Sequence, residues 1–264
     1  MDKITIKKLN SLLKKYNSLR LDSVLDYERF NIMSIIWHST KIEGCSLTEL
    51  ETRVLLENNI TAGGKSLTDH LMVKDHFEAF QFIRLAAIEK KKFSIAFIQE
   101  ISAYVMKNTG AAINSISGNF DSSKGDIRLV QVYVDKKYFP NHKKVPHLLE
   151  QFCQQVNDKI DKVEGDDILA LAADVHYNFV NIHPFADGNG RVSRLLMNYI
   201  MLYHHQPLIK IFTEDRITYI NALNETEDKG NLTIFRTFTA QQYIKYLSME
   251  IEKYTKKSGF NLMF

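Results

Sequence analysis

The sequence predicts an all-α protein, a bundle of helices with one small β-hairpin. Only four prolines and eleven glycines interrupt its 264 residues, and apolar residues recur with a 3.6-residue period over most of the chain, as in amphipathic helices. One short run, residues 128–134 with the sequence RLVQVYV, instead alternates and is rich in β-branched residues, which is typical of a strand. We expect this run to lie in the only sheet, a hairpin over residues 127–139.

Helix-start and helix-stop signals divide the part of the chain before this hairpin. Gly44 is a natural helix stop, and Ser46-Leu47-Thr48-Glu49 is interpreted as a capping box that starts the next helix. Ser66 and Ser94 open two further helices, and Leu85 is expected to face inward on the first of them. The expected helices span residues 3–20, 25–42, 46–57, 66–90 and 94–106.

A glycine- and serine-rich segment, residues 108–126, follows and is expected to be an irregular loop. The expected helices after the hairpin span residues 146–162, 166–182, 191–205, 213–227 and 232–257. We divide the chain into an N-terminal helical region over residues 1–65, a core domain over residues 66–230 and a C-terminal helix over residues 231–264.

Composition is that of an ordinary soluble protein, with 45% hydrophobic and 25% charged residues. The net charge of +3 gives no support for a nucleic-acid-binding or membrane-binding surface. Cys45 and Cys153 are too few for a disulfide framework. The N-terminus lacks an apolar leader and no run of eighteen apolar residues occurs, so we expect a cytoplasmic protein.

The residues that can support chemistry are concentrated in the segment His183–Arg194, with the sequence HPFADGNGRVSR. Gly188 and Gly190 flank Asn189, which allows backbone N–H groups to point into one concavity. An apolar run with helical spacing follows at once, so this turn opens onto a helix N-terminus, where anions are favoured. The segment therefore predicts a phosphate-binding turn.

Four charged or titratable side chains surround that turn in the sequence. Arg191 and Arg194 are three residues apart, on nearby faces of the first helical turn. Asp187 supplies a carboxylate, which beside phosphates indicates a bridging Mg²⁺, and His183 can accept a proton. The alternative is a polar helix cap after a proline turn, with the His183 side chain in the core. The number of such groups in twelve residues favours a functional site.

The segment resembles the Fic signature, His-Pro-Phe-x-Asp-Gly-Asn-Gly-Arg-x-x-Arg, at every fixed position, and the resemblance extends over most of residues 30–225. It implies the Fic fold, a helical bundle around the motif helix. It also implies transfer of AMP from ATP to a Ser, Thr or Tyr hydroxyl of a target protein, which can be the protein itself. Dimers are common among similar proteins, so a homodimer is an open expectation.

The resemblance also implies roles for the motif residues. ATP is expected to bind with its phosphates over Gly188, Asn189 and Gly190, with Asn189 holding the α-phosphate. Mg²⁺ would be held by Asp187, while His183 would deprotonate the target hydroxyl. Arg191 would neutralise the leaving pyrophosphate, and Arg194 would contact the γ-phosphate.

Two further segments gain a function from the resemblance. Fic proteins carry a hairpin flap that aligns the target by strand addition, which assigns target positioning to Arg128, Leu129, Val130, Gln131 and Val132; the alternative is an ordinary surface hairpin. The Fic lead-in Gly-x-aromatic-Arg appears as Gly125-Asp126-Ile127-Arg128, with Ile127 in place of the aromatic residue. Tyr219, on the helix that lines the base pocket in similar proteins, is a candidate for packing the adenine.

Ser39-x-x-x-Glu43-Gly44 resembles the inhibitory motif of Fic proteins that carry their own inhibitor. Glu43 is expected to pair with Arg194 and to place negative charge where the γ-phosphate should bind. The alternative is a helix end at which Glu43 is solvated.

Three other functions remain possible at this stage. A Fic relative could transfer another phosphate-containing group, or remove AMP, because the motif contacts phosphates rather than the base. A non-enzymatic nucleotide-binding regulatory module would not need His183. A metal-dependent phosphohydrolase would need more ligands than one carboxylate and one histidine.

Overall fold

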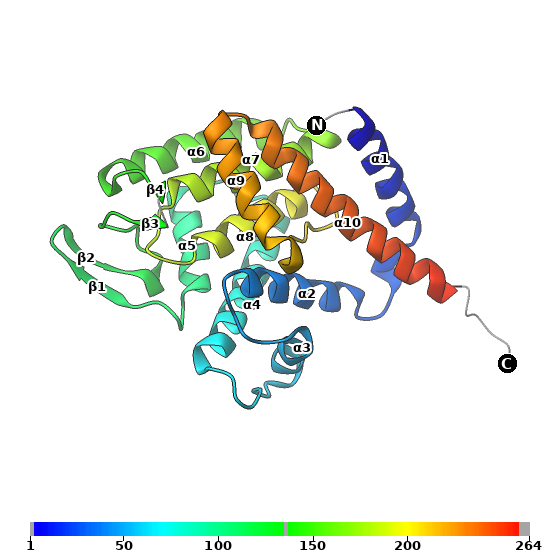
Figure 1. Ribbon diagram of the computed structural model, residues 1–264, viewed down its shortest axis with the longest axis horizontal. Coiled ribbons are helices and arrows are strands. Elements are labelled where there is room, and N and C mark those ends of the chain that lie inside the picture. The colour runs from blue at the N-terminus through cyan, green and yellow to red at the C-terminus, as the bar shows by residue number, and fades with distance from the viewer. Residues whose placement is uncertain (1–2, 135–136, 259–264) are drawn as a thin grey trace.

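The computed structural model describes residues 3–134 and 137–258, and in them the chain is all-α with two short hairpins, so the predicted fold class is confirmed (Figure 1). The described residues form ten α-helices. These are α1 (Lys3–Ser18), α2 (Tyr27–Ile42), α3 (Glu49–Asn58), α4 (Leu67–Ile88), α5 (Ile95–Val105), α6 (Val145–Ile160), α7 (Asp166–Ile182), α8 (Asn189–Tyr203), α9 (Arg216–Lys229) and α10 (Leu232–Ser258).

Helix α8 lies at the centre of the bundle, where α7, α4, α5 and α2 pack around it (Figure 1). Thirteen of its fifteen residues are buried, which is the pattern of a helix enclosed on all sides rather than of one with a solvent face. Its buried Asn198 amide is fully paired: it accepts from Ile209 N at 2.8 Å and donates to Ile209 O at 3.0 Å. The motif helix is therefore held rigidly by its surroundings.

The first and last helices of the described chain pack together, with α1 lying along α10 (Figure 1). A buried cluster of tyrosine hydroxyls adds polar contacts there: Tyr27 lies 2.7 Å from Tyr16 and 3.1 Å from Tyr246 between hydroxyl oxygens. These contacts join the predicted N-terminal region to the predicted C-terminal helix. No helix in the described ranges combines the length and the apolar character needed to cross a membrane.

Helix starts follow the predicted caps with one exception. Ser66 and Ser94 accept hydrogen bonds from Asp69 N and Phe97 N and begin α4 and α5 as predicted. The capping box of α3, however, is formed by Thr48 and Glu51, so the predicted box starting at Ser46 was placed two residues too early. Ser46 instead binds the Asp69 carboxylate through its hydroxyl and its N–H.

Leu85 was wrongly expected to face inward on α4. Its side chain is 58% exposed, while Ala86 and Ala87 beside it are buried. The reason is that α4 packs through small residues near its C-terminus, a choice that the apolar pattern alone does not show.

The expectation of a single sheet was also wrong. Strand β1 (Ala112–Ser115) pairs antiparallel with β2 (Gly118–Asp121), in the segment expected to be an irregular loop. The second hairpin, β3 (Tyr133–Val134) with β4 (Lys137–Tyr138), falls inside the predicted range of 127–139, and its turn, residues 135–136, lies outside the described residues. Strands this short and polar give too weak a period-2 pattern to be found from the sequence.

Helix α8 offers a test of the packing. Leu196→Ala removes a side chain that is fully buried and should lower the free energy of unfolding by about 2–5 kcal/mol, because it leaves a cavity in the centre of the bundle. The matched change Leu85→Ala, at an exposed helix position, should alter it by less than about 0.5 kcal/mol. Urea unfolding of both variants measures the difference, and equal losses would contradict the central position of α8.

Candidate active site

The motif segment is a loop between two helices with unusual backbone angles at both ends. His183 follows the last residue of α7 with a φ of 51°, and Gly188 precedes α8 with a φ of 78°. Positive φ is uncommon for a residue with a side chain and tends to occur at functional sites. As predicted, the glycine turn opens onto a helix N-terminus, where the N–H groups of the first turn have no partner within the helix.

Asn189 closes this loop on itself. Its side-chain oxygen accepts from Phe185 N at 3.0 Å, and its amide nitrogen donates to Phe185 O at 2.8 Å. The residue is 2% exposed, so its side chain fixes the turn rather than reaching outward. The expected contact between Asn189 and the α-phosphate stays a prediction.

The imidazole of His183 is oriented by two contacts. Its ring stacks on Phe139 with 3.8 Å between ring centroids, and its Nδ1 lies 3.2 Å from Val180 O. A carbonyl can only accept, so Nδ1 carries the proton and Nε2 is the nitrogen able to accept one. Burial lowers the pKa of His183 to about 4, and the charges of Arg128 and Lys137 act in the same direction. The imidazole is therefore neutral near pH 7.

Arg128 anchors the segment before β3 to the motif loop. Its buried guanidinium donates from Nε to His183 O at 2.7 Å and to the carbonyls of Val130 and Pro140. Residues 128–131 lie outside the paired strands, and Val132 O accepts from Phe139 N at 3.3 Å just before β3, so the hairpin begins later than expected. Since the Arg128 side chain is enclosed, it supports the loop and cannot itself meet a target.

Phe139, which was not found from the sequence, is part of the same construction. Gln131 donates from its side chain to Phe139 O at 2.6 Å, and Phe139 in turn packs on the His183 ring. An aromatic residue directly before Pro140 at the end of the hairpin was the available signal, but nothing in the sequence joins it to His183.

The two motif arginines are buried, at 2% and 4% exposure. Arg191 lies under the turn, where it donates to Val105 O at 3.1 Å and comes within 3.8 Å of the Asp187 carboxylate. Burial lowers the pKa of Arg191, against the opposing charges of Asp187 and Glu43. Arg191 therefore places its positive charge beneath the turn.

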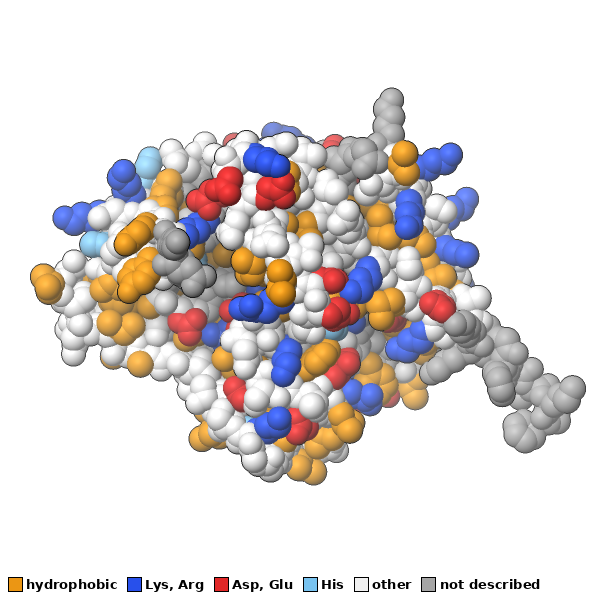
Figure 2. All heavy atoms as spheres, viewed as in Figure 1, with side chains coloured by type: hydrophobic (Ala, Val, Ile, Leu, Met, Phe, Trp, Pro, Cys, Tyr) orange, Lys and Arg blue, Asp and Glu red, His pale blue; other side chains and the backbone are white. Residues whose placement is uncertain are grey.

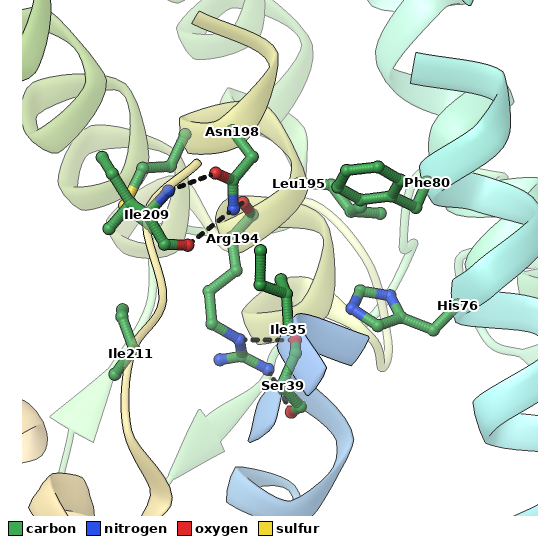
Figure 3. Close-up of a pocket in the computed structure, with 10 residues that line it drawn as sticks. Ile35, Ser39, His76, Phe80, Arg194, Leu195, Asn198, Ile209 and Ile211 are labelled. Atoms are coloured by element: carbon green, nitrogen blue, oxygen red, sulfur yellow. Dashed lines mark hydrogen bonds between the residues drawn. The ribbon is translucent and has the colours of Figure 1, made fainter. Parts of the chain in front are cut away.

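Arg194 is held by the end of α2. It donates from Nε to Ser39 Oγ at 2.8 Å and from one terminal nitrogen to Ser39 O at 2.9 Å, as Figure 3 shows. The same terminal nitrogen donates to Glu43 Oε1 at 2.6 Å. Burial acts to raise the pKa of Glu43, but Arg194 and the other nearby arginines outweigh it, so the pKa is lowered. The pairing expected from the sequence is thus present, with Glu43 ionised.

Gly190 has a second role that sequence reasoning missed. A Cβ atom at this position would lie 2.3 Å from Glu43 Oε1. Only glycine therefore lets the Glu43 carboxylate rest against the first turn of α8. Glu43 occupies the anion-favouring end of the helix, where its negative charge is stabilised.

Asp187 is the one motif side chain that projects into solvent, with 74% of its side chain exposed. Its Oδ1 accepts from Gly188 N at 2.6 Å. Within the described ranges, no three His, Cys, Asp or Glu side chains gather as metal ligands. A single exposed carboxylate fits Mg²⁺, because this ion commonly takes one or two carboxylates and completes its shell with water and substrate phosphates.

Tyr219 packs behind Arg194 rather than beside an opening. It is 3% exposed, its hydroxyl lies 3.0 Å from His176 Nε2, and its ring packs on Phe238. Burial lowers the pKa of His176 well below its ordinary value. This placement gives no support to a base-pocket role; the sequence could not show which face of α9 turns to the core.

Comparison with known proteins gives a consistent result. Residues 92–201 match the Fic/DOC family. Protein adenylyltransferase Fic of Drosophila erecta is 32% identical over 215 residues, which are 81% of this chain and 41% of the fly protein. Protein adenylyltransferase fic-1 of Caenorhabditis elegans is 28% identical over 275 residues, covering 100% of this chain and 50% of the worm protein. The chain spans half or less of these curated relatives.

Solved structures show the same fold. A Fic-domain-containing signalling protein from Bacteroides thetaiotaomicron superposes with a TM-score of 0.79 at 24% identity, over 94% of this chain and 98% of that one. A segment of Fic-1 from C. elegans superposes with a TM-score of 0.74 at 27% identity, over 97% and 73%. With the motif geometry described above, these likenesses show that the chain contains a Fic/DOC domain.

Proposed function

We propose that this protein is a protein adenylyltransferase, which moves AMP from ATP to a Ser, Thr or Tyr hydroxyl of a protein, itself included. The observation that carries the proposal is the His183 imidazole, neutral and tied through Nδ1, on the loop that opens onto the N-terminus of α8. Two relatives named protein adenylyltransferase support the reaction class.

In the proposed reaction, His183 Nε2 takes the proton of the target hydroxyl as its oxygen attacks the α-phosphorus of ATP. A new P–O bond joins AMP to the target, and the bond to the leaving pyrophosphate breaks. The N–H groups of Asn189 and Gly190 and the buried cation of Arg191 stabilise the negative charge of the phosphates. Asp187 would hold Mg²⁺, which when bound supplies further neutralisation of phosphate charge.

We propose that the β3–β4 hairpin positions the target, because an extended segment of the target pairs with the edge of the hairpin as an additional strand. The support is that the hairpin lies next to the loop of His183, through Phe139 and Arg128. Its paired residues Tyr133 and Tyr138 are 66% and 75% exposed. Exposed aromatic side chains on a short strand offer a surface on which an extended peptide can pack.

We propose that Glu43 inhibits the enzyme. While Glu43 and Ser39 hold Arg194, this arginine is withheld from the γ-phosphate, and a carboxylate rests against Gly190. ATP would then meet negative charge at the position where its own phosphates need positive charge. Nucleotide bound in this state would adopt a pose unsuited to in-line attack on the α-phosphorus.

We also propose that the protein is cytoplasmic, that it does not bind nucleic acid and that it forms a homodimer. The two buried free cysteines suit a reducing compartment. On the face shown in Figure 2, basic and acidic side chains are interspersed rather than gathered into one positive surface.

The reaction class can be tested by mass spectrometry. The Glu43→Gly protein incubated with Mg-ATP should gain the mass of an AMP group on a hydroxyl side chain of itself or of an added target. If the protein instead attaches a different nucleotide, or removes AMP from a modified target, the site catalyses another reaction and AMP transfer is refuted.

His183→Ala should abolish transfer while leaving ATP affinity within about twofold, because the imidazole serves proton transfer rather than phosphate binding. Transfer is followed with α-labelled ATP and affinity by calorimetry, both on the Glu43→Gly background. His147→Ala, at an exposed histidine outside the loop, is the control. Persistent labelling by His183→Ala would remove His183 from its proposed role.

The pH profile of transfer should reflect the lowered pKa of His183, about 4. The base is then unprotonated above about pH 5, so kcat/KM should stay level as the pH falls from 7 to 5 and decline only below. An unperturbed histidine would lose half its base form near pH 6.5. Glu43 raises the pKa of His183, so the Glu43→Gly change lowers this pKa further and cannot by itself cause a loss of activity near pH 6.5. A fall in kcat/KM near pH 6.5 would contradict a His183 that is neutral down to about pH 5.

Glu43→Gly should raise self-labelling several-fold, because it frees Arg194 and removes the carboxylate from the turn. Glu89→Gly is a matched control: Glu89 is the exposed C-cap of α4, and its φ and ψ of −75° and −3° resemble those of Glu43, −82° and 1°. Equal activity of the wild type and both variants would refute inhibition by Glu43.

A further inference from the structure

A cavity of about 450 Å³ lies between α2, α3 and α10, away from the motif loop. Three cations line it, Lys210, Arg53 and Lys253, together with two acidic residues, Glu49 and Glu250. Aromatic side chains, among them Tyr27 and Phe30, form part of its wall. The lining thus carries an excess of one positive charge.

Lys210 is the unusual member of this lining. Its side chain is 7% exposed, and its Nζ donates to Ser34 Oγ at 3.0 Å. None of the ion pairs formed by the described residues includes Lys210. Burial lowers its pKa, against the opposing charges of Glu250 and Glu49. A buried ammonium group without a carboxylate in contact is costly, and such groups are usually paired.

Arg53 shows the same lack of a partner from the other side of the cavity. Its guanidinium lies over the Phe30 ring, 4.3 Å from the ring centroid, while its buried Nε has no hydrogen-bond partner in the described residues. The side-chain oxygen of Asn31, which also lines the cavity, is likewise buried without a partner. Several polar groups at one cavity therefore have unused hydrogen-bonding capacity.

We propose that this cavity binds a small organic anion, a phosphate monoester or a carboxylate attached to a flat ring. Its anionic group would be held by Lys210 and Arg53, and its ring would pack on Phe30 and Tyr27. A phosphate or carboxylate oxygen supplies the acceptors that these cations lack. The volume suits a ligand of that size.

The cavity and the active site share one helix. Ser34 lies nine residues before Glu43 on α2, a distance of about 13 Å along the helix axis. A ligand that contacts α2, α3 and α10 together favours the arrangement in which α2 is docked. Occupancy should therefore strengthen inhibition by Glu43. This consequence rests on the proposed function, whereas binding itself does not.

Calorimetry with phenyl phosphate tests the binding, with inorganic phosphate and benzoate as separate arms that distinguish the ester, the free anion and the carboxylate. We expect saturable binding to the full chain. Lys210→Met and Arg53→Gln should each weaken it roughly tenfold, the effect of losing one charge-assisted hydrogen bond. Lys245→Met is the matched control, because Lys245 also lies over an aromatic ring but is paired with Glu214 and Asp215.

Thermal unfolding of each variant shows whether it remains folded, and wild-type protein should gain stability with added phenyl phosphate. No binding by the wild type up to about 10 mM, unchanged binding by both variants, or full competition by Mg-ATP would each overturn the proposed site. If binding is seen but self-labelling of the wild type does not fall, the site stands and its link to inhibition fails.

Discussion

The structure depends on how one buried cation is neutralised. Arg194 extends from the central helix α8 into a region closed by α2, and its 4% exposure means that water cannot supply its hydrogen bonds. Ser39 and Glu43 supply them instead. Breaking a buried pair leaves an uncompensated charge, which is strongly destabilising. The same contacts therefore fix α2 on the bundle and, in the proposed inhibition, withhold Arg194 from a phosphate.

The surroundings of Arg194 strengthen this pair. His76 and His176 are fully enclosed, and burial keeps the pKa of each well below its ordinary value, with the nearby arginine charge acting in the same direction. Tyr219 covers the remaining side. Uncharged groups of this kind exclude water without competing for the Glu43 carboxylate. Attraction between opposite charges is stronger in such a medium than in water, which favours a well-defined pair of Arg194 and Glu43.

The motif loop shows preorganisation by its own residues. Asn189 ties the turn to Phe185, Arg128 ties it to the hairpin segment, and Phe139 supports the imidazole. Each contact fixes geometry before any substrate is present, so little has to be ordered during the reaction. The site is thus built on rigid helices with one short adaptable hairpin beside it.

The sequence by itself determined the helical class, most helix boundaries and the identity of the motif, because apolar periodicity, glycine turns and cap residues are local signals. It also indicated the partner of Arg194, since Ser39-x-x-x-Glu43-Gly44 resembles the inhibitory motif of Fic proteins. Only the tertiary structure decided that Asn189, Arg128 and Tyr219 point inward, that residues 112–121 form a hairpin, and that Gly190 admits the Glu43 carboxylate. These depend on which face of each element is covered by segments distant in sequence, and a local pattern contains no information about that packing.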